Sequence, residues 1–214
     1  MKLNLLKRLG AASCAALAVV VGAGSLAACV PLALGGAAAG TALVATDRRT
    51  SGAQLEDEGI ELRAASRIRS TMGTRVRVAV TSYNRQVLLT GEVGSAQDKQ
   101  LVEQTVAGVE NVGTVVNEVG VLNTPSLVER SSDLLITGRI KASVLDARDL
   151  QSNAFKVVTE RGNVYLMGLV TQREADRVTE LARAVPNVQK VVRMFEIISE
   201  DELRQLQPRA RQAV

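Results

Sequence analysis

The sequence repeats itself, and this repeat constrains the fold more than any other feature. The segment VLLTGEV at residues 87–93 returns in altered form as VYLMGLV at residues 164–170, which lies 77 residues later. A valine-rich segment follows each copy, at residues 109–119 and 185–195. Two copies are too few for a solenoid, so the repeat predicts two small domains in tandem.

Each copy carries the hydrophobic pattern of a helix, two strands, a second helix and a third strand. The first helices are predicted at residues 58–72 and 132–146, and the strand pairs at 76–80 and 87–89 and at 155–157 and 164–166. The second helices begin at Ser95 with Asp98 and at Thr171 with Glu174, and they end at Gly108 and Pro186. We therefore expect repeat one at residues 55–123 and repeat two at residues 127–199, followed by a C-terminal tail at 200–214.

The predicted fold class is α+β. The crossover from the second strand through a helix to the third suits a right-handed parallel connection. Each unit is thus αββαβ, a three-stranded mixed sheet that two helices cover on one face. Gly91 and Gly168 are expected to allow close approach of a helix to the sheet. Repeat one has Arg85 where repeat two has Gly162 in the hairpin, which leaves its turn type open.

The N-terminal residues have the order of a lipoprotein export signal. Residues 1–8 are short and cationic, residues 9–24 are apolar and rich in alanine, and Leu26-Ala27-Ala28-Cys29 resembles the bacterial lipobox. We expect residues 1–28 to be removed, Cys29 to be the lipid attachment site, and residues 29–54 to form a tether. An ordinary signal peptide or an uncleaved anchor is the alternative, and residues 30–45 could instead pack on the folded part or lie in the membrane interface.

Composition narrows the function classes. Without residues 1–28 the chain has 23 basic and 22 acidic residues, so its charge gives no reason to expect nucleic acid as a partner. There is no histidine, which removes the commonest general base and metal ligand. The carboxylate runs at residues 56–58 and 200–202 are interpreted as solvated faces or helix N-termini. We predict no catalytic residues, no cofactor and no metal, and therefore no enzyme.

The first helix of repeat two is predicted to be apolar on two sides. At about 100° per residue, Ile136, Ile140 and Val144 form one stripe, which we assign to the core. The opposite side is formed by Leu134, Leu135, Gly138, Ala142 and Leu145, with Arg139 and Lys141 at its margins. In repeat one the corresponding side carries Arg63, Ser66 and Ser70 and is expected to be wet. A helix with two apolar sides needs two covers, and only one of them is the sheet.

Two partners for the second apolar side of this helix are consistent with its residues. Leucines flanked by basic residues suit interfacial contact with anionic lipid, and the same leucines could instead pack against repeat one in an inter-domain contact. Leu145 could also lie beyond the end of the helix.

The Leu-x-Gly-x-Val segment at residues 89–93 and the closing segments around Val115-Val116 and Val191-Val192 resemble BON domains. Two such domains behind a lipobox resemble the dual BON-domain lipoproteins of the outer membrane. The resemblance implies a lipid-anchored protein that faces the periplasm, binds anionic phospholipid through the first helix of the second BON domain, and supports envelope integrity, including at the division site. A larger aromatic residue of a relative matches Leu135, which implies shallower insertion here.

Two other functions stay open at this point. One is a periplasmic interaction module that docks an envelope protein partner, such as an assembly factor or a regulator of cell-wall amidases. The other is a stress-induced, chaperone-like protein, which single-chain BON relatives suggest.

Overall fold

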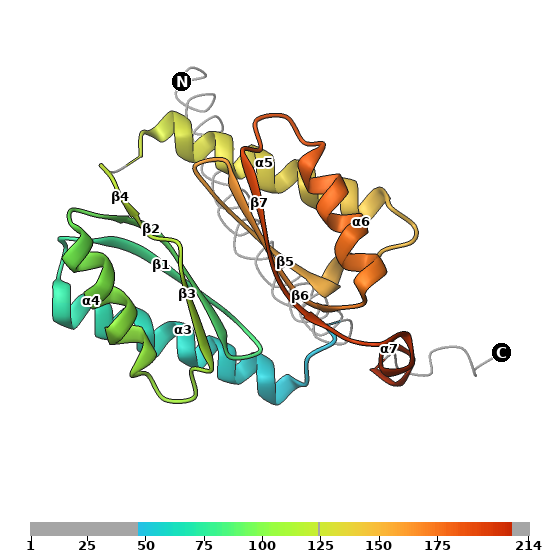
Figure 1. The fold of residues 1–214 in the computed structure, drawn as a ribbon, viewed down its shortest axis with the longest axis horizontal. Coiled ribbons are helices and arrows are strands. Elements are labelled where there is room, and N and C mark those ends of the chain that lie inside the picture. Colours follow the sequence, from blue (N-terminus) through green and yellow to red (C-terminus); the bar gives the residue numbers. More distant parts are fainter. Residues whose placement is uncertain (1–46, 124, 207–214) are drawn as a thin grey trace, which may run out of the picture. The chain divides into compact units, whose positions relative to one another are not determined.

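The computed structural model of the protein describes residues 47–123 and 125–206, which belong to one compact unit that starts at Asp47 (Figure 1). The predicted signal segment, Cys29 and most of the predicted tether lie outside the described residues.

Both repeats have the predicted order of elements, αββαβ. Repeat one consists of α3 (Ser51–Met72), β1 (Arg77–Tyr83), β2 (Gln86–Val93), α4 (Ala96–Ala107), β3 (Thr114–Asn117) and the short β4 (Gly120–Val121). Repeat two consists of α5 (Leu127–Asp146), a 3-10 turn (Ser152–Ala154), β5 (Phe155–Glu160), β6 (Asn163–Val170), α6 (Gln172–Arg183) and β7 (Lys190–Ile197). A last helix, α7 (Glu200–Leu206), follows.

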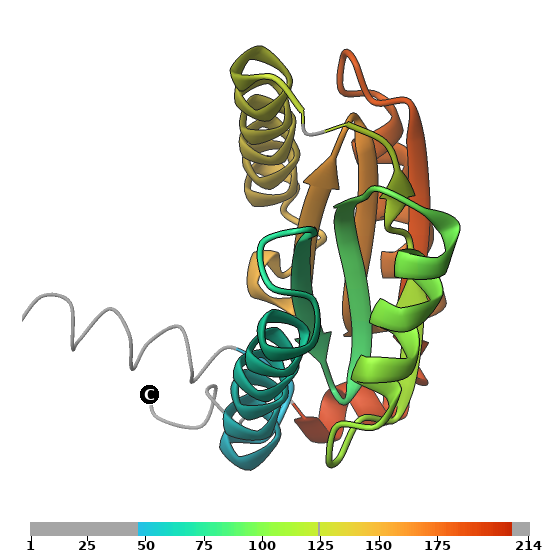
Figure 2. The ribbon, with the colours of Figure 1, turned by 90° about the vertical axis from the view of Figure 1, so that its left-hand side faces the viewer.

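The sheets confirm the predicted mixed topology. The strand orders are β1-β2-β3 and β5-β6-β7, in which the hairpin strands pair antiparallel and the third strand pairs parallel with the central one. In repeat one the third strand is interrupted, and β4 continues its pairing with β2. Figure 2 shows α3 and α4 side by side in front of the first sheet. The predicted core residues Ile136, Ile140 and Val144 are buried between α5 and its sheet.

Both first helices begin earlier than the apolar pattern predicted. Thr50 caps α3 through a bond from the Ala53 amide to its side chain, so the predicted tether boundary at residue 54 is too late by one helical turn. Ser126 and Glu129 form a capping box that starts α5 at Leu127. The acidic run at residues 200–202 occupies the first turn of α7, as one of its two interpretations expected.

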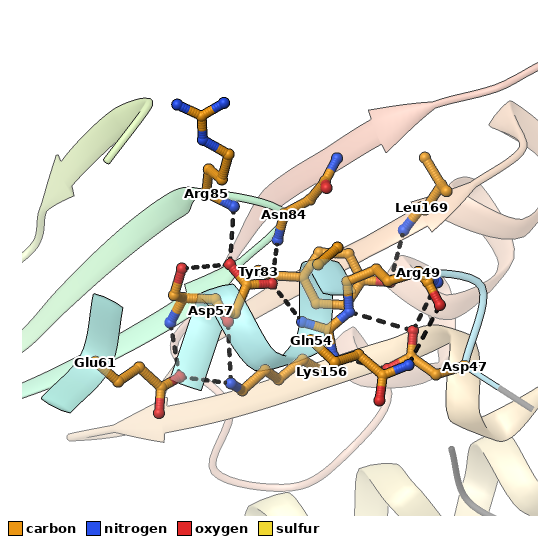
Figure 3. Close-up of polar contacts among 12 residues, drawn as sticks. Asp47, Arg49, Gln54, Asp57, Glu61, Tyr83, Asn84, Arg85, Lys156 and Leu169 are labelled. Atoms are coloured by element: carbon orange, nitrogen blue, oxygen red, sulfur yellow. Dashed lines mark hydrogen bonds and ion pairs between the residues drawn. The ribbon is translucent and has the colours of Figure 1, made fainter. Parts of the chain in front are cut away.

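A buried aspartate of each first helix holds the hairpin turn of its own repeat. Asp57 accepts hydrogen bonds from the backbone amides of Asn84 (2.7 Å) and Arg85 (2.8 Å), as Figure 3 shows. Asp133 likewise accepts bonds from the amides of the second turn, both at 2.8 Å. The expectation that residues 56–58 form a solvated face is therefore wrong for Asp57, which is buried.

The two hairpin turns share one conformation although only one contains glycine. The central residues all have positive φ: 49° and 66° at Asn84 and Arg85, and 50° and 73° at Arg161 and Gly162. Two positive φ angles in a two-residue loop are the mark of a type I′ turn. Arg85 therefore occupies the left-handed region that Gly162 enters at no steric cost.

The glycines Gly91 and Gly168 have a different role from the one expected. A Cβ at Gly91, where φ is 114°, would lie 2.0 Å from the carbonyl oxygen of Arg77 on the neighbouring strand. At Gly168 it would lie 2.5 Å from the carbonyl oxygen of Ala154. Gly91 thus makes room for the backbone of the neighbouring strand β1, and Gly168 makes room for the 3-10 turn that precedes β5, so neither accommodates one of the long helices.

The sheet faces that carry no helices pack against each other. Tyr83, Leu88, Tyr165, Met167 and Met194 form one buried apolar cluster that draws on both sheets. Leu88 on β2 and Tyr165 and Met167 on β6 alternate along their strands with valines and leucines that face the helices. The two sheets therefore bury one face against each other, and α3, α4, α5 and α6 lie on the outside.

Polar contacts surround this cluster. Lys156 bridges to repeat one through Glu61 (2.8 Å) and the carbonyl oxygen of Ser82 (3.1 Å), as Figure 3 shows. Each hairpin also reaches the end of the other repeat's central strand. The hydroxyl of Tyr83 accepts the Leu169 amide at 3.2 Å, and Arg161 pairs with the buried Glu92 at 3.0 Å.

Candidate functional site

Among the described residues, α5 carries more of the exposed large apolar side chains than any other element. Leu134, Leu135 and Leu145 are 75%, 61% and 71% exposed, and Gly138 and Ala142 between them are exposed as well. Leu145 lies inside the helix, which ends one residue later at Asp146. All five predicted apolar site residues therefore lie on a side of α5 that the described residues leave exposed.

The apolar side continues to the first turn of α5. Leu127 and Val128 are both 79% exposed. At about 100° and 1.5 Å per residue, Leu127, Leu134 and Leu145 fall on one line along the helix, about 27 Å long. Val128 lies to the same side of this line as Leu135. Leu127 and Val128 are not among the predicted site residues, because the apolar pattern predicted a helix that starts at residue 132. The capping-box pattern Ser126-x-x-Glu129 could have revealed the earlier start.

Basic residues without an acidic partner accompany this apolar side. Arg139 and Lys141, both predicted at its margins, are exposed, and so are Arg130 and Arg148. Within the described part of the chain these four side chains form no ion pair or hydrogen bond. Two of the three acidic residues of α5 are engaged elsewhere, since Glu129 pairs with Arg161 and Asp133 holds the buried hairpin. The exposed charge along α5 is therefore mainly positive.

The alternative cover for the leucines, repeat one, lies elsewhere. Repeat one contacts repeat two through the sheet faces, whereas Leu134 and Leu135 project from the opposite side of α5 to Ile136 and Ile140. Helix α3 differs from the expectation, because Leu55 and Leu62 are exposed on its outer side. That side is still more polar than the one on α5.

A shallow groove borders the apolar side of α5. It has a volume of about 360 Å³ and lies between α5 and the end of α6. Arg139 and Ala142 belong both to the groove and to the predicted site, and Leu181 and Val185 contribute apolar surface from α6 and the residues after it. The site thus combines a convex apolar line with a bordering depression.

The described residues offer little for other chemistry. No group of three or more cysteine, aspartate or glutamate side chains among them is arranged to hold a metal ion. No helix in residues 47–123 and 125–206 has the length and apolar content that crossing a membrane requires. Two of the three carboxylates of the first acidic run have structural partners: Arg63 pairs with Glu56, and Arg49 pairs with Asp57.

Comparison with known proteins places these features in a family. The BON domain matches residues 60–123 and again residues 132–199, which together make up more than half of the chain. The protein belongs to the BON-domain family. Each BON match starts within the first helix of a repeat and covers the remaining elements of that repeat, so α5 is the first helix of the second domain.

Curated relatives agree with this assignment. The chain is 34% identical over 185 residues to "Outer membrane lipoprotein DolP" of Haemophilus influenzae, which covers 85% of this chain and 95% of that protein. It is 30% identical to the "21 kDa hemolysin" of Actinobacillus pleuropneumoniae, over 71% of this chain and 79% of that protein. It is 31% identical to "Osmotically-inducible protein Y" of Escherichia coli, over 53% of this chain and 58% of that protein.

The similarity to DolP extends across both BON domains and assigns the location. This BON-domain protein is an outer-membrane lipoprotein, anchored by lipid and facing the periplasm, as the sequence analysis predicted.

Proposed function

We propose that this BON-domain lipoprotein is not an enzyme and that it binds anionic phospholipid through the outer side of α5. The observation that carries the proposal is a line of exposed leucines, Leu127 to Leu145, beside basic side chains that have no acidic partner. A helix with this distribution lies flat in a membrane interface, with its leucines in the acyl region and its basic residues at the headgroups.

The magnitudes suit a protein that is already anchored. Each basic residue close to an anionic surface contributes about 1 kcal/mol, and each buried leucine contributes about 2 kcal/mol. These contributions are modest for a free protein, but an anchor raises the effective concentration of α5 at the membrane. Lipid contact of this kind supports envelope integrity. A role at the division site rests on the resemblance to the family alone.

Sedimentation with vesicles tests the proposal. The protein from residue 29, with Cys29→Ser to prevent acylation, is expected to bind vesicles that contain phosphatidylglycerol and not pure phosphatidylcholine vesicles. Leu135→Glu should weaken this binding at least tenfold, because it replaces an inserted apolar group with a charge of the same sign as the lipid. Added salt should weaken binding as well.

Leu62→Glu provides a matched control. Leu62 is 73% exposed on the first helix of repeat one, so the same substitution there should leave vesicle binding unchanged. Equal losses from Leu62→Glu and Leu135→Glu would show that charge alone matters and would contradict a specific lipid face. If the protein binds neither the phosphatidylglycerol vesicles nor the phosphatidylcholine vesicles, the exposed side of α5 is better explained as the docking surface of an envelope protein.

We also propose Cys29 as the acylation site, on the lipobox residues 26–29. Cells that express the protein in the presence of labelled palmitate should yield labelled wild type and unlabelled Cys29→Ala. Cys14→Ala is the control and should retain the label, because Cys14 lies inside the apolar export segment. Label on the Cys29→Ala protein would refute this site.

A further inference from the structure

Arg48 forms a buried ion pair with a residue that is distant in sequence. Its guanidinium donates two parallel bonds to the carboxylate of Glu174, both at 2.8 Å, and the two side chains are only 3% and 4% exposed. It also donates to the carbonyl oxygen of Leu169 at 2.9 Å and to Gln151 at 3.4 Å. All three partners belong to repeat two, whereas Arg48 precedes the first helix of repeat one.

The neighbouring arginine fastens the same segment to repeat one. Arg49 pairs with Asp57 at 2.6 Å, and its guanidinium lies 4.1 Å from the centre of the Tyr83 ring. Residues 47–49 are therefore held between the repeats before α3 begins at Ser51.

Burying Arg48 and Glu174 carries a large desolvation cost. Apolar side chains of similar size would fill the same space without that cost. A bidentate arginine pair adds geometric specificity instead, because the fork fits one carboxylate in one orientation. Glu174 is itself fixed by the capping box of α6, so the partner of Arg48 is rigid. The pair sets where the chain enters the folded unit.

The entry point lies beside the repeat that carries α5. Gln151, which Arg48 contacts, follows the end of α5 at Asp146 by five residues. The anchored end of the chain is thus joined covalently to repeat one and fastened non-covalently to repeat two.

We propose that Arg48 is a latch that fastens the anchored end of the chain to repeat two and so holds α5 at the membrane. Arg48 acts here as a positioning residue, and the inference rests on the proposed function of α5. With the latch closed, the tether pulls on the repeat that carries the lipid-binding helix. With the latch open, it pulls on α3, and α5 engages the membrane less often.

Trypsin cleavage tests the latch itself. The acylated protein, placed in vesicles with phosphatidylglycerol, should resist cleavage after Arg48, because the side chain that trypsin must bind is buried. Glu174→Gln removes the charge of the partner and should speed this cleavage at least tenfold, whereas Glu180→Gln, an exposed change on the same helix, should not. Equal cleavage rates in the wild type and Glu174→Gln would overturn the latch.

A probe on α5 tests its consequence. An environment-sensitive dye on Ser131→Cys, an exposed position on the apolar side of α5, reports insertion. In the acylated protein Glu174→Gln should lower the inserted fraction severalfold, while unacylated Glu174→Gln should bind vesicles as tightly as the unacylated wild type. Arg48→Lys, which keeps the charge but loses the fork, is the second variant should Glu174→Gln fold poorly.

The outcomes separate the two proposals. If the dye inserts equally in wild-type and latch-open protein, the positioning role of Arg48 is wrong and lipid binding by α5 stands. If the dye stays in water in every protein, lipid binding fails, while the trypsin result still decides whether the latch exists.

Discussion

Asp57→Ala lowers the free energy of unfolding by about 4 kcal/mol, since a buried carboxylate with several charged or buried donors is removed. Asp57 accepts bonds from the Ser82 hydroxyl (2.6 Å), from the amides of Asn84 and Arg85, and from the Arg49 guanidinium. Truncation leaves these donors without their acceptor. It also frees a hairpin whose Arg85 has a φ of 66°, where a non-glycine residue is strained.

Urea unfolding measures this effect, and two comparisons check its cause. Glu58→Ala, an exposed change next in the same helix, should alter the free energy of unfolding by less than about 0.5 kcal/mol. Asp133→Ala should cost about 2–3 kcal/mol, because Asp133 accepts only two amide bonds and its turn contains Gly162. A loss from Asp133→Ala as large as that from Asp57→Ala would contradict the role of the extra donors.

The pH dependence follows from the pKa of Asp57. Burial raises this pKa, but the hydrogen bonds from Ser82, Arg85, Asn84 and Arg49 outweigh it, and the net pKa lies below the ordinary value. A carboxyl with a lowered folded pKa stabilises the fold above its unfolded pKa, and this contribution is lost as pH falls through the folded one. The difference in free energy of unfolding between wild type and Asp57→Ala should be constant from about pH 7 to 5 and shrink below about pH 4. A difference that grows in acid would contradict this assignment.

The repeat and its periodicities predicted the fold because each element buries one stripe of its own residues. The core stripe of α5 and the strand order required only local patterns. The helix starts were missed because apolar periodicity begins after the cap. The signal Ser126-x-x-Glu129 was present but lies before the first core residue Ile136.

Part of the packing of the two sheets against each other could also have been predicted from the sequence. Val87, Leu88 and Leu89 are consecutive apolar residues, as are Val164 to Met167, and strands apolar on both faces need two covers. By contrast, the pair Arg48–Glu174 spans 126 residues, and no local pattern signals it. The same holds for the donors of Asp57, because a carboxylate that meets a turn 27 residues away looks like any solvated acid in sequence.

Leu88→Ala and Leu145→Ala should have opposite consequences. Leu88 is fully buried in the cluster between the sheets, so its truncation should lower the free energy of unfolding by about 3 kcal/mol. Leu145 is 71% exposed, and its truncation should change this free energy by less than about 0.5 kcal/mol. Urea unfolding provides both values, and vesicle sedimentation should show weaker binding for Leu145→Ala alone.

These opposite effects are expected because Leu88 is buried between the sheets, whereas Leu145 is exposed on the outer side of α5. An apolar side chain is stabilised when another surface removes it from water. The two sheets do this for each other's leucines, such as Leu88. Among the described residues, nothing covers the outer leucines of α5, so their apolar surface is available to a membrane or another partner. A loss of stability in Leu145→Ala comparable to that in Leu88→Ala would mean that the chain itself covers this side of α5. The lipid surface would then have no free leucines to bind.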